Sequence, residues 1–443
     1  MKSFGTNCTL PPDGVGFVSS PNTRGTLDIL WTCLSVLLIC TWSILHLNVP
    51  MQSTPNGKAQ KYLRSAHRLF WKLMWMMANV IAPEWPFGKA WADYLSVSSV
   101  EKRFEELKEE DQVHWSRTHC YFANMGGIAI KFEESTKTSP KMPHETSTAR
   151  FASSLYHWLC NLTLLGGDLW VLDANQILLA RELGILEQLP SLHEDDVEDR
   201  NKGDLFVKIV AVVQIGWFFI QMGARLKKGF ATSQLEILTL AYAICTAITY
   251  LLLLDQPKDV QYSVIISATR YPTYKELIRL AAVGPTSFWQ PRKNVWIPNT
   301  AVHADTRRFG AGRDTTLAMG TAFAVFLLGS LHCVAWEFVF PTEVERTLWR
   351  ASSIITALAM PAGLATNMIV RSIWNCACGS RVSGTFVRPR AQNAATGFSD
   401  LTFALIFVAA RIFTIVEVLR SLAFLPSDAF VTTWSSNLPH IGS

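Results

Sequence analysis

Two apolar runs near the middle of the chain decide the fold class: residues 205–222, LFVKIVAVVQIGWFFIQM, and residues 235–254, LEILTLAYAICTAITYLLLL. Each holds about the 18 to 20 residues that a helix needs to cross the hydrocarbon core of a bilayer. A helix satisfies all its backbone hydrogen bonds internally, which a segment in lipid requires. The segment between them, 223–234, has room only for a turn and a short interfacial helix. The sequence therefore predicts a transmembrane hairpin over 205–254.

The composition of the whole chain agrees with an integral membrane protein. Of its 443 residues 49% are hydrophobic and only 17% are charged, whereas soluble domains average about 25% charged residues. The formal net charge of +5 is modest, and the basic residues alternate with acidic ones instead of forming a basic stripe. We therefore expect the lipid bilayer as a partner and no nucleic acid.

The same criteria, applied outward from the hairpin, predict further spans. Strong candidates are residues 27–49, 315–340, 348–370 and 401–424. A weaker candidate, residues 69–85, contains Lys72 and Pro83, so it either crosses with a kink or lies in the interface as an amphipathic helix. The predicted fold class is all-α: a polytopic transmembrane helical bundle of about seven spans with long extramembrane loops.

The remaining segments are expected to be extramembrane. The predicted order is a disordered lead (1–26), a first membrane segment (27–98), a long polar connection with interfacial helices (99–204), the hairpin (205–254), a polar cap loop (255–314), a three-helix membrane segment (315–424) and a tail (425–443). Within the long connection we expect helices over 100–112, 151–172 and 174–186. Two glycosylation sequons lie at Asn7, usable only if this end faces the lumen, and at Asn161, which burial would make unusable. We expect a multi-pass protein of the endoplasmic reticulum or another endomembrane.

Charged residues at membrane depth are the first candidates for a functional site, because each must find a partner, reach water or become neutral. Arg411 lies in the middle of the last span, and Glu417 is six residues further on, on a different face of the helix. Arg411 therefore needs either a carboxylate from another helix or an anionic ligand. Glu84 directly follows Pro83 at the end of the weak span and is a candidate substrate-binding residue.

A second group lies at the end of the span 315–340. His332 and Trp336 are one helical turn apart, and Glu337 follows. An imidazole and a carboxylate beside an aromatic ring suit acid–base chemistry in a wet pocket, but they equally suit an interfacial aromatic belt. The candidate catalytic residues are His332, Glu337 and Arg411.

Three further residues are candidates for substrate binding besides Glu84. Trp336 supplies an aromatic wall, and His46 is either an interfacial cap or a functional imidazole. Glu236 begins its span, where the helix dipole alone would favour a carboxylate. Nine cysteines show no paired CxxC spacing, and neither an HExxH motif nor a P-loop is present. We therefore expect no metal ion or other cofactor.

Several segments resemble a known family. EDRNKGDLFVKIVAVVQIGWFFIQ, QLEILTLAYAICTAITYLL with QPKDV, LGSLHCVAWEFVFPTEVERTLWRASS, and also APEW and ANMGG, are similar to a large family of fungal polytopic membrane proteins encoded beside natural-product biosynthesis genes. The resemblance extends to membrane proteins of diterpenoid pathways, among them the Diels-Alderase associated with sordarin. The family pattern has aromatic residues before a Lys-Pro pair where this chain has residues 254–257, LDQP, so a role tied to that lysine is not expected here.

The resemblance implies a membrane enzyme of fungal secondary metabolism that catalyses a cyclisation or a pericyclic, Diels-Alder-type step on a lipophilic terpenoid or polyketide. The residues are compatible with this: a Trp- and Phe-rich helical pocket could fold a polyene into its reactive conformer, while His332 or Arg411 polarises a carbonyl group. The alternatives are a transporter, exporter or receptor for such a metabolite, or a structural scaffold.

Overall fold

The computed structural model describes residues 16–20, 23–52, 58–132, 169–192, 197, 204–287, 296–303, 313–377 and 390–433. Most of the chain is helical, and six helices are long and apolar enough to cross a membrane. This confirms the predicted fold class, a transmembrane helical bundle, and with it a multi-pass membrane protein. The sequons at Asn7 and Asn161 lie outside the described residues.

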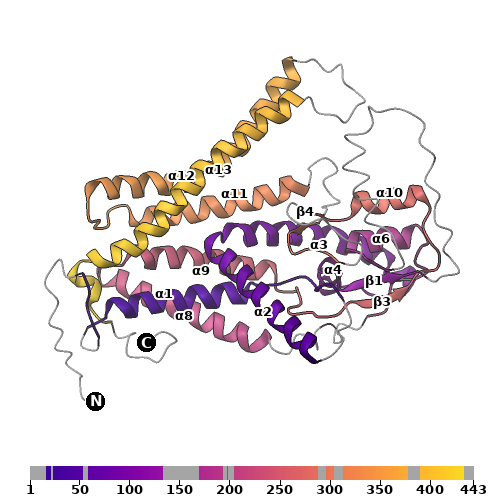
Figure 1. Ribbon diagram of the computed structural model, residues 1–443, viewed down its shortest axis with the longest axis horizontal. Coiled ribbons are helices and arrows are strands. Elements are labelled where there is room, and N and C mark those ends of the chain that lie inside the picture. The colour runs from indigo at the N-terminus through magenta and orange to yellow at the C-terminus, as the bar shows by residue number, and fades with distance from the viewer. Residues whose placement is uncertain are drawn as a thin grey trace.

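The six candidate spans form what we call the membrane bundle. They are α1 (Thr26–Ser43), α8 (Asp204–Lys227), α9 (Gln234–Leu252), α11 (Arg313–His332), α12 (Glu343–Ala377) and α13 (Arg390–Arg420). In Figure 1, α1, α8, α9 and α11 follow the long axis of the molecule, whereas α13 is inclined to it. The helix expected over 315–340 is shorter than predicted, since α11 stops at His332 and gives way to the 3₁₀ turn η3 (Cys333–Ala335).

Polar contacts close one end of the bundle, which we call the termini end. The Arg24 amide donates to the carbonyl of Phe430 (3.0 Å), beyond α13, and the Arg24 guanidinium pairs with Glu236 at the start of α9 (2.5 Å). Arg420, the last residue of α13, pairs with Glu345 near the start of α12 (2.6 Å). The first span therefore begins, and the last one ends, on the same side of the membrane, as six crossings require.

The candidate span 69–85 is replaced by two helices. α2 (Lys58–Ile81) and α3 (Glu84–Asp111) are separated at Ala82 and Pro83, because a residue before proline avoids the helical conformation. α2 is not among the six candidate spans; five basic residues interrupt its apolar pattern: Lys58, Lys61, Arg64, Arg68 and Lys72. The expected seventh span is thus not found as a crossing helix.

Instead, α2 and α3 form a re-entrant hairpin that enters the bundle and turns back. The Tyr242 hydroxyl, in the middle of α9, donates to the carbonyl of Asn79 in the last turn of α2 (2.6 Å). Gly88, one turn into α3, lies so close to α11 that a Cβ there would be 2.9 Å from the Thr321 amide nitrogen. Since Tyr242 is at mid-span, the tip of the hairpin lies near half the depth of the bundle.

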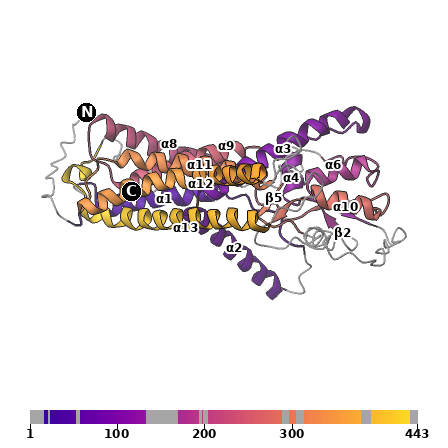
Figure 2. The same ribbon diagram turned by 90° about the horizontal axis from the view of Figure 1, so that it is seen from above.

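The second half of α3 leaves the membrane bundle and joins a separate body, which we call the cap (Figures 1 and 2). The other elements of the cap are α4 (Arg117–Asn124), β1 (Ile128–Lys131), β2 (Leu169–Val171), α6 (Ala174–Glu182), β3 (Val264–Ser267) and α10 (Tyr274–Val283). Trp115, Trp170 and Leu280 are buried in its apolar core. A two-stranded pair, β4 (Thr286–Ser287) with β5 (Ala301–Val302), lies nearby in sequence.

A small sheet makes the cap one unit. Its strand order is β2-β1-β3: β1 pairs antiparallel with β2 and parallel with β3. β1 comes from the connection 99–204 and β3 from the connection 255–314, so the two polar connections fold together and are not independent loops. The prediction of a helix over 151–172 is wrong at its C-terminal end, because Leu169–Val171 is a strand.

Candidate functional site

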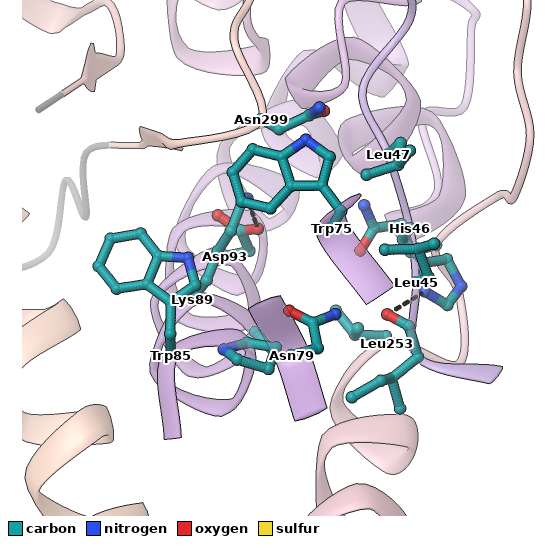
Figure 3. Close-up of a pocket in the computed structure, with 14 residues that line it drawn as sticks. Leu45, His46, Leu47, Trp75, Asn79, Trp85, Lys89, Asp93, Leu253 and Asn299 are labelled. Carbon is teal, nitrogen blue, oxygen red and sulfur yellow. Dashed lines mark hydrogen bonds and ion pairs between the residues drawn. The ribbon is translucent and has the colours of Figure 1, made fainter. Parts of the chain in front are cut away.

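A pocket lies where the re-entrant hairpin passes from the membrane bundle into the cap. We call it the junction pocket (Figure 3). Its cavity volume is about 50 Å³, and it is lined by residues 44–47 after α1, by α2 and α3, by the segment after α9, and by Asn299. Four separate parts of the chain thus meet at the boundary between the bundle and the cap.

Two tryptophans from the two arms of the hairpin form walls of the pocket. Trp75 comes from α2 and Trp85 from α3, and Figure 3 shows both indoles beside Asn79 and the Lys89–Asp93 pair. The backbone amide of Asn48 donates a hydrogen bond to the side-chain oxygen of Asn299 (2.7 Å) and so holds Asn299 in place. The pocket therefore offers flat apolar surface together with a few fixed polar groups, as small-molecule sites usually do.

A single ion pair supplies the charge of the pocket. The Lys89 ammonium lies 2.5 Å from Asp93 Oδ2, one turn further along α3, and the two side chains are 17% and 6% exposed. Asp93 Oδ1 is buried and has no hydrogen-bond partner. Because a buried acceptor without a partner costs free energy, the pair has unused capacity to bind a donor from a ligand.

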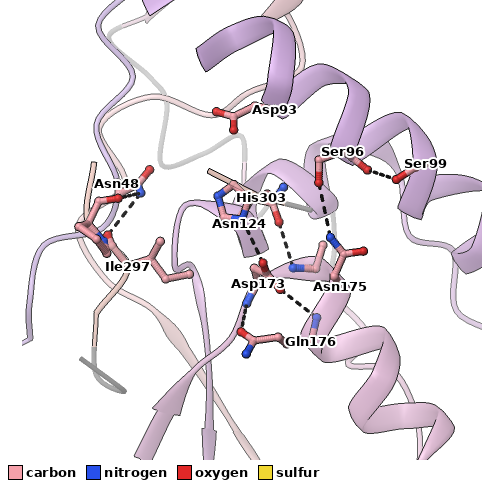
Figure 4. A network of polar contacts seen from close by, with 12 residues as sticks. Asn48, Asp93, Ser96, Ser99, Asn124, Asp173, Asn175, Gln176, Ile297 and His303 are labelled. Carbon is pink, nitrogen blue, oxygen red and sulfur yellow. Dashed lines mark hydrogen bonds and ion pairs between the residues drawn. The ribbon is translucent and has the colours of Figure 1, made fainter. Parts of the chain in front are cut away.

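A buried polar network lies behind the pocket, on the cap side (Figure 4). Asp173 is the N-cap of α6: its Oδ1 accepts a hydrogen bond from the backbone amide of Gln176 (2.9 Å). Its Oδ2 lies 3.1 Å from His303 Nδ1. The side-chain amide of Asn175 donates a hydrogen bond to the hydroxyl of Ser96 (3.5 Å), which lies on α3 about one turn beyond Asp93. The Asn175–Ser96 bond joins α3 to the cap about one turn from the pocket's ion pair.

A second set of polar groups lies at mid-membrane, next to the tip of the hairpin. Glu84 and Arg411 are both buried, and they interact electrostatically with each other and with Tyr242 and Cys245. Yet no ion pair within 4.0 Å joins Glu84 to Arg411 in the described parts of α3 and α13. Glu84 Oε2 and Arg411 Nε lack hydrogen-bond partners. The carboxylate expected from another helix is therefore present but not in contact with Arg411.

One protein-family model matches residues of both the membrane bundle and the cap. Residues 5–155, 175–283 and 309–441 match the model described as "Family of unknown function (DUF8562)". The chain belongs to this family. Neither a curated protein nor a solved structure matches it. The matched ranges of this DUF8562 protein include the hairpin, with Lys89, Asp93 and both tryptophans of the pocket, and leave out residues 284–308 with Asn299 and His303.

The structure separates the three candidates at the end of α11. His332 is buried, its Nδ1 donates to the carbonyl of Leu328 (2.5 Å), and its Nε2 has no partner. Glu337 is exposed and pairs with Arg350 (3.0 Å), whose guanidinium also lies over the Trp336 ring and donates to the Trp336 carbonyl. These contacts join the connection after α11 to α12. His332, Trp336 and Glu337 therefore do not form one catalytic group, because the helix ends between them.

The remaining candidates fall in different places. His46 lines the junction pocket and its Nδ1 lies 3.2 Å from the Ile44 carbonyl. Glu236 is far from the pocket, in the ion pair with Arg24 at the termini end, where it also accepts from the Ser233 amide (2.8 Å). This capping role accounts for Glu236 without a substrate.

Sequence reasoning missed most of the pocket. Lys89 and Asp93 are a lysine and an aspartate four residues apart, a spacing common on exposed helices, and nothing local marks them as buried. The groups of His, Cys, Asp and Glu within the described ranges include none of three or more that could hold a metal ion.

Proposed function

We propose that this DUF8562 protein is a membrane enzyme that binds the polar end of a lipophilic small molecule in the junction pocket and catalyses a cyclisation or a pericyclic, Diels-Alder-type step. One observation carries the proposal: two tryptophan walls and an incompletely satisfied Lys89–Asp93 pair meet in one pocket at the boundary of the membrane bundle. An amphiphilic substrate would place its polar group at the pair and its hydrocarbon part against the indoles.

The chemistry needs little from the protein beyond position and one donor. Holding a polyene in its reactive conformer lowers the entropic part of the barrier. The Lys89 ammonium is the donor best placed to bind a carbonyl oxygen on the substrate and polarise it. Asp93 keeps that ammonium in place, and its free Oδ1 accepts a hydroxyl from the substrate.

This proposal moves the catalytic role away from the residues expected from the sequence. His332, Glu337 and Arg411 do not line the pocket, whereas His46 does. The wider setting stays as the resemblance implies: a lipophilic terpenoid or polyketide of fungal secondary metabolism, and a location in the endoplasmic reticulum or another endomembrane.

The proposal is tested by deleting the gene in its native host and identifying the metabolites in cells and medium. An enzyme predicts loss of a cyclised product and build-up of its uncyclised precursor, reversed by membranes that carry the wild-type protein. Lys89→Gln should fail to restore the product, and Lys102→Gln, an exposed lysine further along α3, should restore it fully. An unchanged metabolite profile would overturn the proposal.

A second candidate function, transport of the same kind of metabolite, rests on the mid-membrane groups. Charged residues inside a bundle often mark substrate or ion pathways, and interrupted helices at mid-membrane are common in transporters. Glu84 and Arg411 at the tip of the re-entrant hairpin fit this pattern. In the deletion experiment, export predicts that the finished product is made but stays in the cells.

A further inference from the structure

The apolar face of α2 lies outside the protein core. Along the helix, large apolar side chains recur at three- and four-residue spacing on one face, and each is 43–76% exposed: Tyr62, Leu63, Leu69, Phe70, Leu73, Met74, Met77 and Ile81. No residue of the described cap or bundle covers this face. An apolar face of this length requires a partner.

The opposite face of α2 is basic and turns toward the cap. Lys72 pairs with Asp259 (2.5 Å), and Arg68 donates to the Gln261 side chain (3.2 Å). Lys61 and Arg64 continue the same stripe toward the start of the helix, and Lys58 begins it. The helix contains no acidic residue. Lys58 and Lys61, in its first two turns, therefore carry positive charge that no carboxylate among the described residues neutralises.

The placement of α2 suits the boundary of a leaflet. Figure 2 shows α2 leaving the bundle obliquely, while α1, α8, α9 and α11 follow the long axis. Its last turn is held at mid-membrane by Tyr242, and its polar face contacts the cap through Asp259. The start of α2 must then lie near the headgroups on the cap side, with its apolar face toward the acyl chains.

We infer that α2 is an oblique membrane anchor that inserts its apolar face into the cap-side leaflet and binds anionic phospholipid headgroups with Lys58 and Lys61. A basic amphipathic helix with aromatic residues on its apolar face has this preference. Because anionic lipids are concentrated in the cytoplasmic leaflet, the anchor also assigns the cap to the cytoplasmic side. The inner face of α2 carries Trp75 and Asn79, so one helix separates the junction pocket from the lipid.

The test uses the full-length protein, one copy per nanodisc, in phosphatidylcholine with or without phosphatidylserine. Hydrogen–deuterium exchange of the α2 peptides and retention of phosphatidylserine in native mass spectrometry are the two readouts. We expect slower exchange in α2 when phosphatidylserine is present. Lys58→Gln with Lys61→Gln should abolish this difference and weaken phosphatidylserine binding about fivefold for each lysine removed.

The matched control removes the same charge from the cap. Lys102 and Lys275 are exposed lysines on α3 and α10, and the double variant Lys102→Gln with Lys275→Gln should keep the dependence on phosphatidylserine. Equal exchange of α2 in both lipid mixtures, or equal loss of binding in both double variants, would overturn the inference. Protection of α2 only in discs that hold two copies would instead assign its apolar face to a second copy of the chain. None of these outcomes depends on the proposed enzyme activity.

Discussion

Glu236 and Glu84 are both buried carboxylates in the first turn of a helix, yet their surroundings differ completely. Glu236, at the termini end, pairs with Arg24 and accepts from the Ser233 amide and hydroxyl. Glu84, at the tip of the hairpin, has a buried oxygen without a partner and no ion pair among the described residues. Both were candidate substrate-binding residues in the sequence, although for Glu236 the helix dipole alone already accounted for a carboxylate.

The difference between the two regions lies in how their buried charges are paired. At the termini end, Arg225 donates to the carbonyls of Ala231, Asp428, Ala429 and Val431, although its Nε and the Nη1 of Arg24 have no hydrogen-bond partner. These bonds join the α8–α9 turn to the segment after α13. At mid-membrane and in the junction pocket, Glu84, Arg411 and Asp93 also retain an unpartnered atom, and Glu84 and Arg411 have no ion pair among the described residues. A group that remains unsatisfied inside a folded protein costs stability, which function can justify.

The largest predicted effect is at the termini end. Glu236→Ala leaves the Arg24 guanidinium buried without its carboxylate, and we expect a loss of about 3–5 kcal/mol in the free energy of unfolding. Thermal unfolding in a mild detergent measures it. Replacing both partners, Arg24→Met with Glu236→Leu, should recover much of the loss, since an apolar pair needs no charge compensation. A single variant as stable as the wild type would remove the distinction between the two carboxylates.

The next effect concerns the contact that holds Glu84 at its depth. A Cβ at Gly88 would lie 2.1 Å from Thr321 Oγ1 and 2.9 Å from the Thr321 amide nitrogen. Gly88→Ala therefore forces α3 away from α11, and we expect a cost of about 1–3 kcal/mol. In α8, a Cβ at Gly216 meets nothing within 4 Å, so Gly216→Ala is the control and should not destabilise. Unfolding midpoints that match for the two variants would show that the hairpin is not packed as tightly as described.

Glu84 itself should behave in the opposite way to Glu236. Glu84→Gln removes a buried charge that has no ion pair, so we expect the free energy of unfolding to change by no more than about 1 kcal/mol. Metabolite turnover or export should nevertheless fall in the complemented deletion strain. A strongly destabilised Glu84→Gln protein would mean that this carboxylate is structural too.

The smallest effect lies in the cap, outside the membrane. Hydrogen bonds from Arg270 hold the pKa of Glu276 at about 2, below its usual value of 4.5. The carboxylate therefore stabilises the folded cap above pH 4.5, and this contribution disappears as the pH falls from 4.5 to 2. Because the two side chains are 38% and 17% exposed, we expect less than about 1 kcal/mol. Unfolding midpoints of Glu276→Gln and wild type should differ above pH 4.5 and converge at lower pH; a difference independent of pH would contradict this.

Sequence patterns alone were sufficient for the membrane bundle. A helix in lipid must be long, apolar and internally hydrogen-bonded, and these are local properties that the runs at 205–222 and 235–254 display directly. The same local reasoning left two alternatives for residues 69–85, and the break at Pro83 was visible in advance. The helix predicted over 174–186 is present as α6 (Ala174–Glu182), and the structure shows that Asp173 caps it.

Only the tertiary structure decided where the junction pocket and its polar groups lie. β1 and β3 pair across a long separation in sequence, so no local sequence pattern indicated that the two polar connections form one cap. The junction pocket likewise needs four distant segments, and Lys89 and Asp93 resemble any exposed helical pair until those segments bury them. Hydropathy determines whether a segment enters the bilayer, because that free energy is summed residue by residue. Whether a buried charge is satisfied depends on which other segments fold against it, and that is set by packing alone.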